Sequence, residues 1–172
     1  FFYIQSSLYG IPFDGLHIYK GPDATMQIKV ASLIPIVNAR GPEMNQGETF
    51  TLFNDMCVLA PATLIDRGIE WETFGPLEVK ARFTNQGNAI TAFLHFNEKG
   101  ELINFISDDR FYSKDGKIYL NYRWSTPLRD YRDAGGRKIA AHGEAIWHTP
   151  EGDYSYAKFM LQEIEYNCRE FK

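Results

Sequence analysis

The chain has 172 residues, of which 44% are hydrophobic and 15% aromatic, and its formal net charge at pH 7 is −4. A chain of this length buries roughly 70% of the surface that its unfolded form exposes, so it can build a core without disulfides or structural metals. Its basic residues are scattered rather than clustered, which argues against nucleic acid as a partner. The longest apolar stretch, residues 30–37, contains Pro35 and is too short to cross a membrane as a helix.

The first 30 residues predict strands. Residues 1–4 read Phe-Phe-Tyr-Ile, which is typical of a strand, and Met26, Ile28 and Val30 alternate with polar residues. Because the chain opens inside a predicted strand and shows no signal peptide, we expect that a further N-terminal segment precedes Phe1. The localisation of the protein is therefore left open by the sequence.

Residues 49–60 predict the main helix, because apolar residues recur there at the spacing of one helical face. The apolar residues are Phe50, Phe53, Met56, Cys57 and Ala60. Asn45 and Glu48 resemble a capping box at the start of this helix, and Asp55 falls on its opposite, solvent-facing side. Pro61 ends the helix and favours a short second one. We therefore expect one or two short helices within about residues 45–66.

The rest of the chain alternates with the period of a strand and is interrupted by turn residues. The predicted strands cover residues 77–83, 90–96, 101–107, 118–124, 143–148 and 154–167. Short strands separated by Gly-, Asn- and Asp-containing turns indicate a mainly β fold with few helices. We expect a single domain over residues 1–172, built as a curled antiparallel sheet or open β-barrel of about 9–11 strands with the helices packed on it.

The sequence contains no phosphate-binding loop, nucleophile elbow or zinc-protease motif. Its histidines are not spaced to share a metal ion, so we expect neither a metal nor a cofactor. Cys57 and Cys168 fit no metal or redox spacing. Two free thiols are the favoured interpretation, and a disulfide between them is left open.

The polar candidate for a functional site is Asp109 with Arg110, part of an Asp-Asp-Arg sequence that follows a predicted strand. A positioned carboxylate with a shifted pKa can perform acid–base catalysis. A solvated turn with a surface ion pair has the same sequence and is the commoner case.

The aromatic residues are a more informative feature. Trp71, Trp124 and Trp147 fall in different strands, and Phe93 lies on the nominally polar side of its strand. This surplus favours either a core on both faces of the sheet or a curved sheet with an apolar groove for a hydrophobic ligand. The residues that we expect to line such a groove are Phe50, Phe53, Met56, Phe93, Trp124 and Trp147.

Longer motifs carry two resemblances. Residues 43–49, Glu-Met-x-x-Gly-Glu-Thr, and residues 54–56, Asn-Asp-Met, resemble a bacterial family that is known only as a domain of unknown function. The Leu-Ala-Pro-Ala-Thr-Leu of residues 59–64, the hairpin that ends near residue 102 and the final stretch up to residue 167 are similar to the lipoprotein-localisation-factor superfamily. That second resemblance implies an incomplete β-barrel with an apolar cavity for acyl chains, and it assigns no ligand residue.

The leading hypothesis is a non-enzymatic binding module that shelters a lipid or another hydrophobic small molecule in an apolar groove. Two alternatives stay open: an enzyme with a polar pocket near Asp109 and Arg110, and an accessory domain with a purely structural role. A deep cluster of ionisable groups would favour the enzyme, an aromatic-lined cavity the binding module, and a filled interior the structural role.

Overall fold

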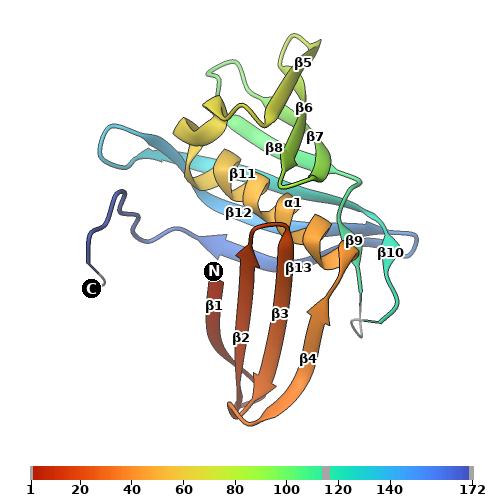
Figure 1. The fold of residues 1–172 in the computed structure, drawn as a ribbon. Helices are drawn as coiled ribbons and strands as arrows, with labels where there is room; N and C mark the ends of the chain where they lie inside the picture. The colour runs from red at the N-terminus through yellow and green to blue at the C-terminus, as the bar shows by residue number, and fades with distance from the viewer. Residues whose placement is uncertain (1, 114–116, 171–172) are drawn as a thin grey trace.

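Two large antiparallel sheets enclose one long helix (Figure 1). The structure is a computed structural model that describes residues 2–113 and 117–170. The N-terminal sheet has the strand order β1-β2-β3-β4. Its strands are β1 (Phe2–Leu8), β2 (Ile11–Lys20), β3 (Asp23–Val30) and β4 (Ile34–Arg40). Tyr9 and Gly10, between β1 and β2, both have positive φ angles, and turns of this kind match the twist of a hairpin.

The second sheet has seven strands in the order β13-β12-β11-β8-β7-β6-β5. Its strands are β5 (Ile69–Gly75), β6 (Glu78–Asn85), β7 (Asn88–Phe96), β8 (Leu102–Ser107), β11 (Arg123–Asp133), β12 (Lys138–Thr149) and β13 (Gly152–Met160). The pairs β5–β6, β7–β8 and β12–β13 each contain a register shift, and such irregularities bend a sheet. Between β8 and β11 in the chain, β9 (Phe111–Tyr112) and β10 (Leu120–Asn121) form a small two-stranded sheet.

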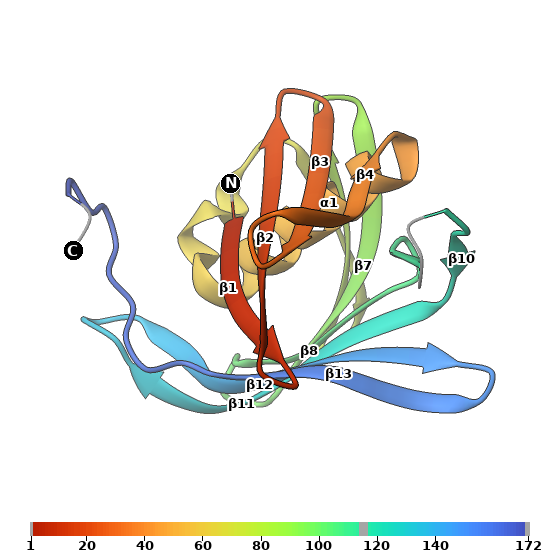
Figure 2. The same cartoon turned by 90° about the horizontal axis from the view of Figure 1, so that it is seen from below.

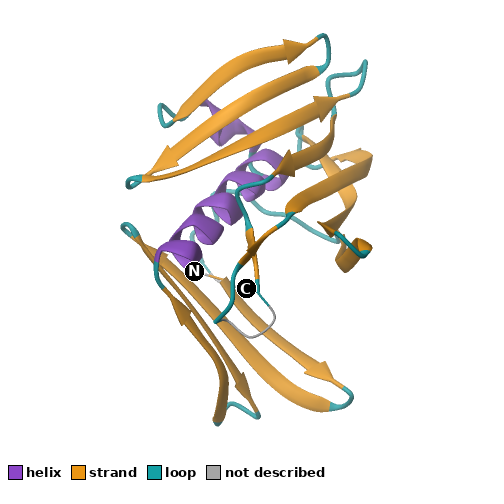
Figure 3. Cartoon of the chain, turned by 90° about the vertical axis from the view of Figure 1, so that its right-hand side faces the viewer, coloured by secondary structure: helices purple, strands orange, loops and turns teal. Residues whose placement is uncertain are grey.

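The helix α1 (Pro42–Leu59) lies between the two large sheets, as Figures 2 and 3 show from two further directions. It packs on β7 and β12 of the seven-stranded sheet and on β3 and β4 of the N-terminal sheet. Its buried residues are Thr49, Phe50, Phe53, Met56, Cys57 and Val58. The short 3-10 helix η1 (Pro61–Ile65) follows it directly, because the proline ring cannot continue an α-helix but is well placed to start a new turn.

The capping box predicted at the start of α1 is wrong. The helix begins earlier, at Pro42, after Gly41 with a φ of 116°, and no side chain caps it. Asn45 and Glu48 lie inside the helix, where their side chains contact the N-terminal sheet rather than the start of the helix. The Asn45 side-chain oxygen accepts a hydrogen bond from the backbone N–H of Ala24 (2.7 Å), and Glu48 Oε1 lies 3.0 Å from His17 Nδ1.

The predicted fold class is confirmed: the protein is mainly β, with antiparallel sheets, one helix and a 3-10 turn, and the described residues form no closed barrel. The predicted strand over residues 118–124 is divided between β10 and β11, and the one over residues 154–167 ends at Met160. The Arg132 side chain donates to the carbonyls of Leu161 (2.6 Å) and Gln162 (2.7 Å). These carbonyls are therefore bound outside any strand pairing, and the chain leaves the sheet there.

Candidate functional site

The residues predicted to line an apolar groove lie mainly in the core. Five of them are buried, namely Phe50, Phe53, Met56, Trp124 and Trp147. They pack against one another, as shown by the 4.9 Å between the ring centres of Phe50 and Trp124. Phe93 lies apart from them, on the face of β7 opposite the buried Leu94, where its ring is 5.2 Å from that of Phe74. The six side chains therefore do not line one common groove.

Ring contacts lead from this core to the surface. The ring centre of Trp147 lies 5.3 Å from that of Tyr112 and 6.4 Å from that of Tyr156. Tyr112 in turn lies 5.6 Å from Tyr122. The indole N–H of the buried Trp124 donates to the hydroxyl of Tyr156 (3.2 Å). The rings thus change from Phe and Trp in the core to Tyr at the surface, where each hydroxyl can meet water or a polar group.

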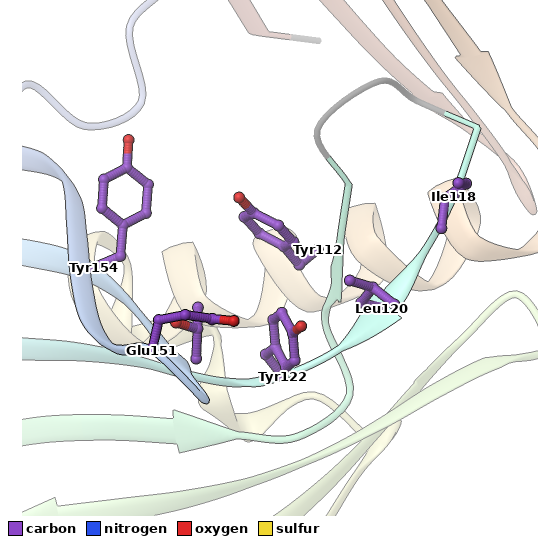
Figure 4. A pocket seen from close by; sticks show the side chains of 7 residues that line it. Tyr112, Ile118, Leu120, Tyr122, Glu151 and Tyr154 are labelled. Carbon is purple, nitrogen blue, oxygen red and sulfur yellow. The ribbon is translucent and has the colours of Figure 1, made fainter.

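Beyond these tyrosines the surface forms a recess of about 820 Å³ (Figure 4). We call it the tyrosine recess; its walls are Tyr112, Ile118, Leu120, Tyr122, Thr149, Glu151 and Tyr154. Ile118, Leu120 and Tyr154 expose 66%, 43% and 55% of their surface. The volume lies within the range of about 300–1,000 Å³ that small-molecule sites occupy, and such sites are mostly apolar with a few polar groups.

The alternation pattern did not predict this recess. Its walls come from β9, from residues 118–122, which include β10, and from residues 149–154 at the turn between β12 and β13, and only tertiary pairing brings these segments together. The available signal was the clustering of tyrosines around residues 112–122 and again at residues 154 and 156. Tyr is an amphipathic residue that is enriched where one side of a side chain is apolar and the other is wet.

Arg110 lies on the aromatic core, two residues before the recess wall residue Tyr112. Its guanidinium carbon is 5.0 Å from the ring centre of Phe50, 5.2 Å from that of Trp124 and 5.9 Å from that of Trp147. Nη1 donates to Thr51 Oγ1 on α1 (3.1 Å), and no carboxylate in the described parts of the chain forms an ion pair with this guanidinium. Contacts between an arginine and three aromatic faces are favourable by about 0.5–2 kcal/mol each, depending on how dry the site is.

Asp109, the predicted partner of Arg110, has different contacts. Its Oδ2 accepts a hydrogen bond from the backbone N–H of Thr91 (2.6 Å), and its carbonyl accepts one from the side chain of Gln46 (2.9 Å). The preceding Asp108 forms the surface ion pair of this segment, with Arg123 rather than Arg110. The structure therefore brings Asp109 and Arg110 next to each other in the chain but directs their side chains to separate partners.

A second recess, of about 460 Å³, lies between α1 and the end of β13. We call it the α1 recess; its walls are Asn54, Asp55, Val58, Leu59 and residues 159–163. Asp55 is accessible to solvent there, but the surrounding protein removes part of its hydration and raises the pKa of its carboxyl to about 6. The positive charge of Arg110 opposes this shift, and the negative charge of Glu48 adds to it. Neighbouring Asn54 donates from its amide to Thr126 Oγ1 of β11 (3.2 Å).

A serine, a histidine and an aspartate form a hydrogen-bonded row across β11, β12 and β13. Ser125 Oγ lies 2.8 Å from His148 Nε2, and His148 Nδ1 lies 2.7 Å from Asp153 Oδ1. Acyl transfer by such a row needs an accessible hydroxyl and free N–H groups to bind an oxyanion. Ser125 is only 3% exposed, and β11 pairs with β8 and β12 on either side of it. The row is therefore better suited to fastening three strands than to catalysis.

Three further features bear on the chemistry. Cys57 and Cys168 are both free, and burial raises the pKa of the Cys57 thiol. Among residues 2–113 and 117–170, no group of three or more His, Cys, Asp or Glu side chains could hold a metal ion. In the same residues, no helix combines the length and the apolar character needed to cross a membrane.

Comparison with known proteins identifies a family. Residues 1–159 match the model of a family described as a family of unknown function, DUF6544. This confirms the resemblance to a domain of unknown function, whereas none of the comparisons links the chain to the lipoprotein-localisation-factor superfamily. No curated protein and no solved structure matches the chain.

Proposed function

The chain belongs to DUF6544, and we propose that this protein is a non-enzymatic binding module that holds a hydrophobic small molecule in its tyrosine recess. The observation that carries the proposal is the recess itself, a space of about 820 Å³ whose wall exposes the large hydrophobic side chains of Ile118, Leu120 and Tyr154. Large apolar side chains that surround a concavity are a common mark of a ligand site.

The energetics of such a site are favourable. Transfer of an alkyl chain from water to an apolar wall gains about 0.8 kcal/mol for each buried CH₂. A chain of about ten carbons would therefore offset the cost of association and bind at micromolar concentrations. The tyrosine hydroxyls and the Glu151 carboxylate are polar groups in the wall, so a ligand with one polar end fits the recess better than a pure hydrocarbon.

The resemblance of residues 59–167 to the lipoprotein-localisation-factor superfamily supports the same class of ligand, because that superfamily shelters acyl chains. The resemblance stands on the motifs of the sequence alone. The enzyme hypothesis has weaker support, since Asp109 and Arg110 have separate partners.

Fluorescence titration with N-phenyl-1-naphthylamine, a neutral apolar dye, tests the proposal. We expect saturable binding near one equivalent. Leu120→Ser and Tyr154→Ser should each weaken it roughly tenfold, because each removes an apolar wall that the dye would cover. Ile103→Ser is the matched control, since Ile103 on β8 is as exposed as Leu120 but lies outside the recess.

Equal binding by the wild type, the two recess variants and the control would show that the dye binds elsewhere. Absence of binding below the aggregation threshold of the dye would contradict the proposal altogether.

A further inference from the structure

We infer that Arg110 gives the tyrosine recess a preference for amphiphiles with a negatively charged head group. The inference rests on the proposed function, and it names the chemical class of the ligand: an apolar chain or ring system that carries a carboxylate, sulfonate or phosphate. Two observations support it. Most N–H groups of Arg110 have no hydrogen-bond acceptor among the described residues, and Arg110 lies two residues before the wall residue Tyr112.

The guanidinium of Arg110 has donors to spare. An arginine carries five N–H donors in a planar fork. Among the described residues, the guanidinium of Arg110 donates to a single acceptor, Thr51 Oγ1. The aromatic faces of Phe50, Trp124 and Trp147 attract the positive charge of the guanidinium but accept no conventional hydrogen bond. The remaining N–H groups are thus free to bind an anion, and a guanidinium matches the two oxygens of a carboxylate or sulfonate.

Arg110 is also close to the recess. It precedes the wall residue Tyr112 by two positions and lies directly before β9. Trp147 joins them, because its ring is 5.9 Å from the guanidinium carbon of Arg110 and 5.3 Å from the ring of Tyr112. A ligand that covers the tyrosines and reaches past Tyr112 arrives at the guanidinium.

The nearby acidic groups do not neutralise Arg110 by pairing. Glu48 is engaged by His17 at 3.0 Å. Asp55 forms no ion pair with Arg110, and the pKa of its carboxyl is raised to about 6 by burial despite the positive charge nearby. The guanidinium therefore keeps a charge that an incoming anion can neutralise at close range.

Two dyes with the same ring system separate this inference from the proposed function. N-phenyl-1-naphthylamine is neutral, and 1-anilinonaphthalene-8-sulfonate carries a fixed negative charge. In the wild type, the sulfonate dye should bind more tightly than the neutral one. Arg110→Met should weaken the sulfonate dye by roughly tenfold or more and leave the affinity for the neutral dye within about twofold. Arg123→Met is the control, because Arg123 pairs with Asp108 on the surface and should affect neither dye.

A second measurement needs no variant. Decanoate should displace the neutral dye from the wild type at a lower concentration than decanol, although the alcohol is the more hydrophobic of the two. Equal loss of both dyes in Arg110→Met, or better displacement by decanol, would overturn the inference. Failure of the neutral dye to bind the wild type would instead contradict the proposed function, and sulfonate binding that still depends on Arg110 would then support the anion site alone.

Discussion

Partial burial in the α1 recess raises the pKa of the Asp55 carboxyl to about 6 in the folded protein. An unperturbed aspartate has a pKa of 3.8. Between about pH 4 and pH 6, the folded state therefore holds more protons at this site than the unfolded state does. By linkage, the contribution of Asp55 to the free energy of unfolding falls as the pH rises through this window.

Asp55→Asn removes this dependence, because the amide does not titrate. We expect the variant to gain stability over the wild type at pH 7.5 and to lose most of that advantage at pH 4.5. Urea denaturation at both pH values measures the difference in the free energy of unfolding. A difference of the same size at both pH values would show that Asp55 is not desolvated in the folded state.

Asp55 also shows what a single helix can and cannot predict. The helical spacing placed it opposite the apolar face, and it is indeed accessible to solvent. The residues that wall it in, 159–163, come from the other end of the chain. No local pattern links two segments so far apart, so the shifted pKa could not be predicted from the sequence.

At the scale of elements, the apolar face of α1 packs into the core and stabilises it. Phe53 is fully buried and stacks on Phe83 at 5.1 Å. Phe53→Ala should lower the free energy of unfolding by about 3–5 kcal/mol, the usual effect of removing a core aromatic side chain. Leu52→Ala, at the neighbouring and 37% exposed position, should cost about 1 kcal/mol or less. Denaturant melts of both variants measure the difference, and equal effects would contradict this orientation of the helix.

The N-terminal sheet depends on a different contact with α1. The side-chain oxygen of Asn45 accepts a hydrogen bond from the backbone N–H of Ala24, and Ala24 is almost completely buried. Asn45→Ala should cost about 1–3 kcal/mol, because it leaves a buried donor without a partner. Asn45→Asp keeps an acceptor at the same position and should cost less. Hydrogen exchange at the Ala24 amide gives the direct readout, and unchanged protection in Asn45→Ala would show that the bond does not hold the sheet.

Local rules predicted the elements better than their contacts. The apolar spacing of residues 50–57 identified the buried face of α1, and the strand alternation identified an antiparallel fold. The same rules read Asn45 and Glu48 as a helix cap, because the residue types and spacing match one. Tertiary contacts with Ala24 and His17 use these side chains instead, and the distant partners left no trace in the local sequence.

At the scale of the whole molecule, the aromatic surplus divides into two parts. Phe50, Phe53, Trp124 and Trp147 fill the space between α1 and the seven-stranded sheet, where composition alone had suggested a groove. The tyrosines continue this aromatic layer to the surface and form the recess. Composition could predict that the protein has more rings than one core face needs, but only the arrangement of β9 to β13 decides which rings stay accessible.

The central claim, that the tyrosine recess holds an apolar chain, is tested most directly by quenching with 12-bromododecanol. Bromine quenches indole fluorescence at short range, and Trp147 contacts the recess wall at Tyr112 (5.3 Å). We predict saturable quenching near one equivalent that is retained in Trp71→Phe, largely lost in Trp147→Phe and weakened in Leu120→Ser. Quenching that does not saturate, or that disappears with Trp71 instead of Trp147, would contradict the claim.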